Sequence, residues 1–107
     1  MKIFFNDKKI AELCAKQASR KKLGIKCAKV LEQRLLVLNA TKVLGDCKQG
    51  NPHPLKGDKK GQFAMNLEGG YRLVFTAKNP VLTTKDGATD WKKVKEITII
   101  FIGDYHE

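Results

Sequence analysis

The apolar residues of the first forty positions recur mainly with helical spacing. Residues 2–5 form a short apolar stretch that we expect to be a strand. A helix is predicted next, capped by Asn6 or Asp7 and ending at the basic cluster of residues 20–22, where cations suit the helix dipole. Gly24 then permits a tight turn. A second helix is predicted from one apolar stripe, formed by Cys27, Val30, Leu31, Leu35 and Leu38.

After residue 60 the apolar positions alternate with the period of β-strands. Two alternating runs, at 63–67 and 71–76, flank the turn at residues 68–70 and predict a hairpin. The run 97–102 is apolar at nearly every position, which is typical of a strand inside a sheet. We therefore predict an α+β fold, in which an N-terminal strand and a helical hairpin pack on one face of a mainly antiparallel sheet. Residues 1–107 are expected to form a single domain.

Two segments fit neither period. Residues 41–60 combine glycine, proline and lysine at a density that excludes a long regular element. A connection of this length inside a compact domain is either functional or disordered. Residues 78–93 form a second, polar excursion.

The composition indicates a soluble protein that attracts polyanions. The 107 residues carry 21 lysines and arginines against 11 aspartates and glutamates, a formal charge of +10. Nucleic acid is the commonest partner of such a surface and an acidic protein the second, while a basic surface without a specific ligand remains open. No apolar stretch is long enough to span a membrane, and the one ending at Phe5 is too short for a signal peptide. We expect a cytoplasmic protein with no membrane contact.

The three cysteines, Cys14, Cys27 and Cys47, are widely spaced and include no Cys-x-x-Cys pair. This pattern argues against a disulfide framework and against a zinc site. Cys14 and Cys27 fall on the apolar side of the predicted helices, where we expect them to act as small hydrophobic residues.

The candidate functional groups come from three parts of the chain. Strand alternation places Arg72 on the side of the hairpin away from Tyr71, Leu73 and Phe75, so it should stand on the sheet face that the helices leave uncovered. The C-terminal residues follow an interior strand and should be held near the sheet. The remaining candidates lie in the first irregular segment, and the full set is Arg72, Asp104, Tyr105, His106, His53, Lys56, Lys59 and Lys60.

Each candidate also fits an ordinary structural role. Arg72 can stack on Tyr71, the tail can be solvated, and the loop lysines can be a solvated charge run. Together, however, these groups come without an acidic pair, a metal-ligand cluster or a glycine-rich phosphate loop. Such a combination favours a phosphodiester substrate over an acyl or glycosyl centre.

Three separated segments resemble the HigB branch of the RelE/ParE toxins. They are HPLKGDKKGQF at 53–63, GYRLVF at 70–75 and DYH at 104–106. The resemblance covers nearly the whole chain and implies the fold predicted above. It also implies a toxin that cuts mRNA in the ribosomal A site without metal or cofactor. Its partners would be the ribosome, mRNA and a helix-turn-helix antitoxin, with operator DNA reached only through that antitoxin.

The resemblance also suggests roles for the candidates. Arg72 would bind the phosphoryl oxygens, His106 would transfer a proton, and Tyr105 would stack on a base or orient the 2′-hydroxyl. The substrate-binding group would comprise His53, Lys56, Lys59, Lys60 and Asp104.

Two features depart from the pattern of the family. Asn66 stands where relatives often carry a basic residue, and the excursion at 78–93 is longer than in compact members. Two other functions stay open. One is a ParE-type toxin of the same fold directed at DNA gyrase, and the other is a basic RNA-binding module without enzymatic activity.

Overall fold

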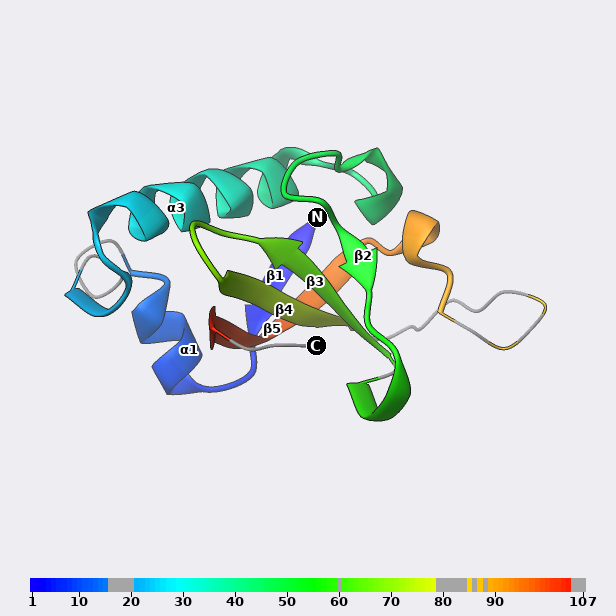
Figure 1. Ribbon diagram of the computed structural model, residues 1–107. Coiled ribbons are helices and arrows are strands. Elements are labelled where there is room, and N and C mark those ends of the chain that lie inside the picture. The colour runs from blue at the N-terminus through cyan, green and yellow to red at the C-terminus, as the bar shows by residue number, and fades with distance from the viewer. Residues whose placement is uncertain (16–20, 60, 79–84, 86, 88, 105–107) are drawn as a thin grey trace.

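The fold is a five-stranded sheet with helices on one side, seen in a computed structural model that describes residues 1–15, 21–59, 61–78, 85, 87 and 89–104 (Figure 1). Among the described residues, the helices α1 and α3, a helical stretch at residues 21–23 and three 3-10 turns accompany the strands. In chain order the elements are β1 (Lys2–Phe5), α1 (Lys8–Leu13), α3 (Ile25–Ala40), η1 (Leu44–Asp46), β2 (His53–Pro54), η2 (Gly57–Lys59), β3 (Gln62–Asn66), β4 (Tyr71–Ala77), η3 (Trp91–Lys93) and β5 (Glu96–Asp104).

The strands are arranged in the order β1-β5-β4-β3-β2. β1 pairs with β5 in parallel, and the other three pairs are antiparallel. β5 therefore lies between two strands, as its apolar sequence predicts. The hairpin of β3 and β4 is also confirmed, and Gly69 has the positive φ of 64° that its turn requires. The predicted α+β class is correct.

The first helix is shorter than its sequence pattern suggests. Asp7 is its N-cap, and the carboxylate accepts a hydrogen bond of 2.9 Å from the Ile10 N–H. The predicted end at residues 20–22 is wrong, because α1 ends at Leu13. The turn tightens there, and the Ala15 N–H donates to the Glu12 carbonyl three residues back, at 3.0 Å. No glycine or proline marks this end. Residues 21–23 are helical again.

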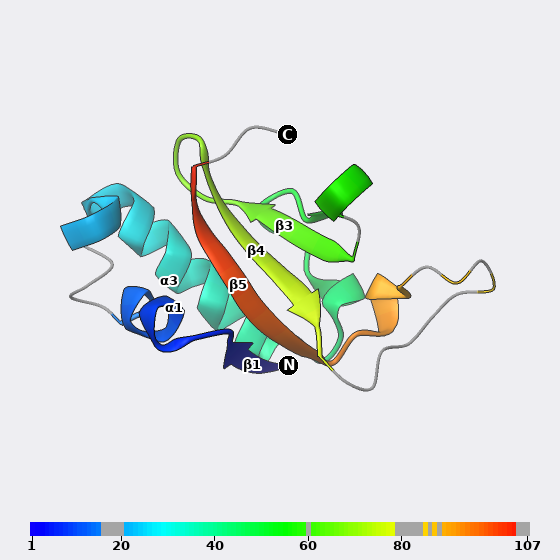
Figure 2. The ribbon, with the colours of Figure 1, turned by 90° about the horizontal axis from the view of Figure 1, so that it is seen from below.

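The second helix follows the prediction closely. α3 begins after Gly24, whose φ of 83° confirms the turn. In Figure 2 both α1 and α3 lie on the same side of β4 and β5. Apolar side chains of both helices pack into one cluster with the sheet. Its residues below 2% exposure are Leu31, Leu38, Met65, Leu73, Phe75, Ile97 and Ile99.

The cysteines belong to this apolar interior. Cys27 and Cys47 are buried, Cys14 is half-buried, and all three thiols are free. Cys14 and Cys27 pack in the same cluster as the helices, so the prediction that they act as small hydrophobic residues is confirmed. Burial raises the pKa of Cys14 to about 11 and also raises that of Cys27.

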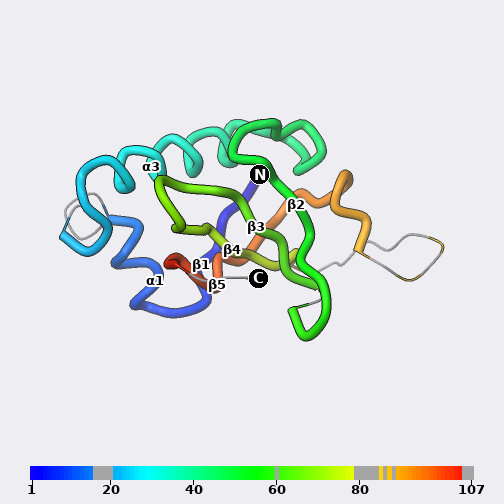
Figure 3. Tube along the Cα trace, viewed as in Figure 1, coloured from blue at the N-terminus to red at the C-terminus, as the bar shows by residue number. Residues whose placement is uncertain are grey.

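The segment 41–60 has no long element but is tied to the rest of the fold. It contains η1, η2 and the two-residue strand β2, which extends the sheet beside β3 and which the sequence pattern did not reveal (Figure 3). The Asn66 N–H donates to the Gly50 carbonyl at 2.7 Å, and Arg34 of α3 donates from Nε to the Asn66 carbonyl at 3.2 Å. Helix, loop and sheet are thus joined around Asn66.

Part of the second irregular segment also contacts the core. Trp91 in η3 packs on Phe63, with ring centroids 4.8 Å apart. Most of the stretch from residue 79 to 88 lies outside the described residues. No helix in the described part of the chain is both long and apolar enough to cross a membrane.

Candidate functional site

The sheet has two faces of different character. One carries Phe75 and the core under the helices, and we call the opposite one, which carries Ala64, Arg72 and Val74, the open face. Residues directly across an antiparallel pair share a face. Arg72 is opposite Asn66 on one side and Gly103 on the other. Val74 is likewise flanked by Ala64 and Phe101.

The open face has a small apolar centre of its own, which the sequence did not predict. Leu55, Ala64 and Val74 are buried there with exposed fractions of 5%, 0% and 2%, and Ile100 packs against them. Leu55 lies within residues 53–59, the lysine-containing stretch that we call the basic loop, so its burial holds that loop against the sheet. A buried apolar centre bordered by polar groups is a common arrangement in ligand sites.

Arg72 lies on the open face, as its sequence position predicts. Its guanidinium is partly buried and donates from Nη1 to the Tyr71 carbonyl at 3.1 Å. Among the described residues, no carboxylate lies within ion-pair distance of it. A partly buried guanidinium without an anionic partner keeps most of its five N–H donors for an incoming anion.

The basic loop brings His53 to the same face. His53 in β2 is opposite Ala64, and its Nδ1 lies 2.8 Å from the Asn51 carbonyl oxygen. Residues 53–59 line a hollow of about 840 Å³, which includes Lys56 and Lys59. The register separates the Cα atoms of His53 and Arg72 by two strands and two residues, roughly 12 Å. Lys60 lies outside the described residues.

The C-terminal candidates are only partly described. Asp104 ends β5 opposite Tyr71, so strand alternation places it away from Arg72 and on the side of Tyr71. A Cβ added at Gly70 would come within 2.8 Å of its Oδ1, which places the carboxylate beside the hairpin turn. The structure thus does not bring Asp104 to the open face with Arg72. Tyr105 and His106 follow directly and lie outside the described residues.

The sequence pattern missed one prominent side chain of this face. Phe101 is 39% exposed although it lies in an interior strand. The cause is a register irregularity between Val74 and Phe75, where Val74 pairs with Phe101 but Phe75 pairs with Ile99. This β-bulge inserts one residue into β5 and changes which side chains face outward. An unbroken apolar run carries no signal for such a bulge.

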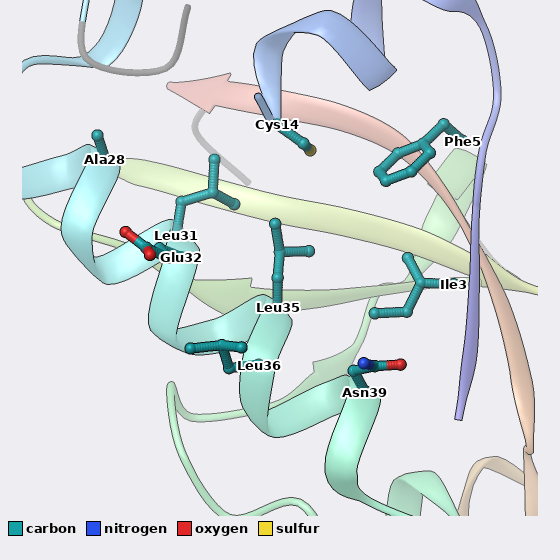
Figure 4. A pocket seen from close by; sticks show the side chains of 9 residues that line it. All are labelled: Ile3, Phe5, Cys14, Ala28, Leu31, Glu32, Leu35, Leu36 and Asn39. Atoms are coloured by element: carbon teal, nitrogen blue, oxygen red, sulfur yellow. The ribbon is translucent and has the colours of Figure 1, made fainter. Parts of the chain in front are cut away.

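A second hollow lies on the other side of the sheet, between β1 and the helices (Figure 4). It measures about 370 Å³ and is lined mainly by apolar side chains, among them Ile3 and Phe5 of β1 and Leu35 of α3. Cys14 also points into it, which fits its raised pKa. The described residues contain no group of three or more histidine, cysteine, aspartate or glutamate side chains able to hold a metal ion.

The comparisons with known proteins give matches in structure only. No protein-family model matches the chain, and no curated protein does. The YoeB–YefM complex from Staphylococcus aureus contains a chain that is 19% identical, with a TM-score of 0.60 over 100% of this chain and 98% of that one. The YoeB/ParE toxin from Agrobacterium tumefaciens is 14% identical, with a TM-score of 0.59 over 99% of this chain and 100% of that one.

A YoeB dimer from Staphylococcus aureus is similar to the same degree. It is 18% identical, with a TM-score of 0.60 over 100% of this chain and 98% of that one. At these identities the likeness concerns the fold, and membership of the HigB branch stays a prediction. The chain therefore has the fold seen in toxins of the YoeB and ParE type.

Proposed function

We propose that this chain is the toxin of a bacterial toxin–antitoxin pair and that it cleaves mRNA in the ribosomal A site. The fold is similar to that of YoeB and ParE-type toxins, one of which was solved in a complex with YefM. The formal charge of +10 suits binding to a ribosome, and the segments quoted above favour the HigB branch. The observation that carries the proposal is Arg72, which lies on the open face of this fold and has no carboxylate partner among the described residues.

The proposed reaction uses the nucleophile that RNA already carries. The 2′-oxygen bonds to the adjacent phosphorus, the bond from phosphorus to the 5′-oxygen breaks, and the products are a 2′,3′-cyclic phosphate and a 5′-hydroxyl. One proton leaves the 2′-hydroxyl and one is given to the 5′-oxygen. The rate then depends on in-line alignment and on positive charge placed in advance at the phosphoryl oxygens.

The described residues suit the charge-stabilising part of this reaction. The planar guanidinium of Arg72 would bind two phosphoryl oxygens at once. His53, Lys56 and Lys59 would hold the neighbouring phosphates at the edge of the open face. For the proton transfers we propose His106, whose reference pKa lies near neutrality, together with Tyr105.

The proposal also names partners and a compartment. A toxin of this kind needs an antitoxin, which we propose to be a helix-turn-helix protein that carries the pair to its operator DNA. Lys60 and Asp104 remain predicted substrate contacts, although Asp104 would have to reach the RNA from the side of Tyr71. Because the target is the translating ribosome, the chain would act in the cytoplasm.

The test is induced expression in bacteria, followed by mapping of 5′ ends on cellular mRNA. Wild type should arrest growth and produce new 5′ ends inside translated codons. Arg72→Ala should remain folded, as judged by circular dichroism, and should cut roughly 10²- to 10³-fold more slowly, as expected when one donor to a developing oxyanion is lost. Lys29→Ala, an exposed change on α3, is the control and should behave as wild type. Full growth arrest by Arg72→Ala would contradict the assignment.

A ParE-type activity is the second candidate, because one structural neighbour is described as a YoeB/ParE toxin. Purified protein separates the two in parallel assays. Cleavage of mRNA on ribosomes with gyrase supercoiling unchanged supports the nuclease, and the opposite result supports ParE. Salt-sensitive RNA binding with neither effect would indicate a non-enzymatic RNA-binding module.

A further inference from the structure

The second irregular segment ends in a turn that is tightly fixed to the first segment. The Leu44 N–H of η1 donates to the Val94 carbonyl at 2.9 Å, directly after η3 (orange in Figure 1). Gly45 lies against the backbone of Lys92, and a Cβ at Gly45 would be only 3.0 Å from the Lys92 Cα atom. The two 3-10 turns therefore pack backbone against backbone, and this packing fixes Trp91, the first residue of η3.

Trp91 packs beneath the part of the sheet that carries β2. Its side chain is partly buried, and its ring centroid lies 4.8 Å from that of Phe63. Phe63 is directly opposite Pro54 on one side and Phe75 on the other, so these side chains share the face under the helices. Trp91 also lines a hollow of about 520 Å³ together with Pro52 and Pro54. The tryptophan thus supports Phe63, the residue with which β2 is paired.

β2 is too short to be held in place by backbone pairing alone. It consists of two residues at the edge of the sheet, whereas strands usually have at least three. The next residue, Leu55, is buried on the open face, and its N–H donates to the Gln62 carbonyl at 2.9 Å. The position of β2 therefore depends on apolar packing from both faces, with Leu55 on the open face and Phe63 and Trp91 on the other.

His53 is the residue of β2 that this support positions. It is opposite Ala64 on the open face, whereas its neighbour Pro54 belongs to the other face, because side chains alternate along a strand. We propose that Trp91 is a positioning residue, which supports β2 through Phe63 and thereby holds His53 and the basic loop in place to bind RNA. This inference rests on the proposed function and extends it, because it assigns a role in the same site to a residue on the other side of the sheet.

The first test measures the attachment of β2 without RNA. Native-state hydrogen exchange reports local opening, and the Leu55 amide reports the pairing of β2 with β3. Trp91→Ala should raise the exchange rate of this amide roughly tenfold relative to that of the Asn6 amide, which donates to the Ile99 carbonyl on the β1 side. Trp91→Phe keeps an aromatic ring on Phe63 and should leave this ratio within about twofold of wild type. An unchanged ratio in folded Trp91→Ala protein would overturn the inference.

The second test compares cleavage on ribosomes programmed with an mRNA. Trp91→Ala should raise KM roughly 2- to 12-fold, the equivalent of about one lost hydrogen bond, and should change kcat by less than about twofold. The effect falls on KM because His53 is proposed to hold a phosphate next to the reacting one. Trp91→Phe should return KM to within about twofold of wild type. A lower yield of active protein whose KM is normal would instead show that the tryptophan only stabilises the fold, and would contradict the proposal.

Leu35→Ala is the matched control. Leu35 is also partly buried and also lines a hollow, but that hollow lies between β1 and the helices. The KM of this variant, and its ratio of Leu55 to Asn6 exchange, should equal those of wild type. An equal rise of KM in Leu35→Ala and Trp91→Ala would reveal a general cost of loosening the fold, and the proposed role of Trp91 would be wrong.

A double-mutant comparison tests whether Trp91 acts through β2. In protein that already carries His53→Ala, adding Trp91→Ala should raise KM by a smaller factor than it does in wild type, because coupled residues are not additive. Equal factors in the two backgrounds would mean that the tryptophan acts elsewhere, and would refute the inference. A wild-type protein that cuts no RNA would overturn the proposed function and with it the role of Trp91 in RNA binding. The exchange rate of the Leu55 amide would still decide whether Trp91 supports β2.

Discussion

The two faces of the sheet are built from the same strands but differ in what they bury. Under the helices, Met65, Leu73, Phe75 and Ile97 are all completely buried. On the open face the buried centre is smaller, and partly exposed groups border it. Because neighbouring residues of a strand point to opposite faces, one strand can serve the core with every second residue and a ligand site with the others.

β4 shows this division within three residues. Leu73 and Phe75 are 0% exposed in the main core, whereas Val74 between them belongs to the small cluster with Leu55 and Ala64. The covered face is one continuous apolar surface that stabilises the fold. The open face combines a short apolar centre with the Arg72 guanidinium and the His53 imidazole.

The largest expected effect tests whether the two faces contribute unequally to stability. Phe75→Ala should lower the free energy of unfolding by about 3–5 kcal/mol, because it opens a cavity in the main core. Val74→Ala should cost about 2 kcal/mol, since it removes two methyl groups from a smaller cluster. Chemical denaturation with the two variants side by side measures both values. Equal losses would mean that the open-face cluster is as important to the fold as the core.

The second prediction separates two partly buried arginines. Arg34 donates to the Asn66 carbonyl at 3.2 Å and to Gln49 Oε1 at 3.3 Å, so Arg34→Ala should cost about 1 kcal/mol of stability and spare the activity of the folded protein. Arg72→Ala should do the reverse, with unfolding within about 0.5 kcal/mol of wild type and cleavage lowered roughly 10²-fold or more. Thermal unfolding and ribosome cleavage assays on both proteins decide this. Loss of activity in folded Arg34→Ala protein would contradict the assignment of a structural role to Arg34 and a functional role to Arg72.

The third prediction concerns the apolar environment on the helix side. Burial raises the pKa of Cys14 from 9.0 to about 11, so folding keeps its thiol protonated at pH values where an unfolded chain is ionised. At pH 8.5 iodoacetamide should alkylate Cys14 roughly 10- to 100-fold more slowly in the native protein than in denaturant, and the native rate should rise as the pH approaches 11. Mass spectrometry of the Cys14 peptide follows the reaction. An equal rate in both states would argue against the buried environment.

The smallest effects are expected from the basic loop. Lys56→Ala and Lys59→Ala should each weaken RNA binding to a similar extent for all sequences. Each should also reduce the slope of log K against log salt by about 1, because each lysine neutralises one phosphate. Lys93→Ala serves as the control, since Lys93 belongs to η3, outside the basic loop, and its Nζ already lies 3.8 Å from Asp90 Oδ2. A base-dependent loss for either loop variant would instead indicate direct contact with a base.

Several parts of the fold follow from local pattern alone. The alternation around Gly69 and Gly70 predicted both hairpin strands, and it placed Arg72 on the face away from Phe75. The apolar stripe that includes Leu31 predicted α3. These predictions succeed because the period of a strand or helix depends on the residues within it. The early end of α1 was not predicted because no glycine or proline marks it in the sequence. Only the hydrogen bonds of the folded chain show where this helix ends.

The candidate site was predicted less completely. His53, Lys56, Lys59 and Arg72 were identified by residue type. The register places His53 and Arg72 on one face of the sheet, and Lys56 and Lys59 line a hollow together with His53. Phe101 was overlooked because its exposure depends on a bulge. The register of β5 against β4 also placed Asp104 beside Tyr71 and not beside Arg72. A shift of one residue in pairing moves a side chain to the other face, so contacts between strands cannot be read from either strand alone.

The amino-acid sequence by itself determined which residues can share a face, where the hairpin turns, and that the surface carries an excess of positive charge. These properties depend on backbone periods and on composition, which act over a few residues at a time. Only the tertiary structure decided that β1 joins β5, that the burial of Leu55 fastens the basic loop to the sheet, and that Phe101 lies over Gly103 beside Arg72. These contacts join residues far apart in the chain or depend on strand register, and packing of the whole domain selects them.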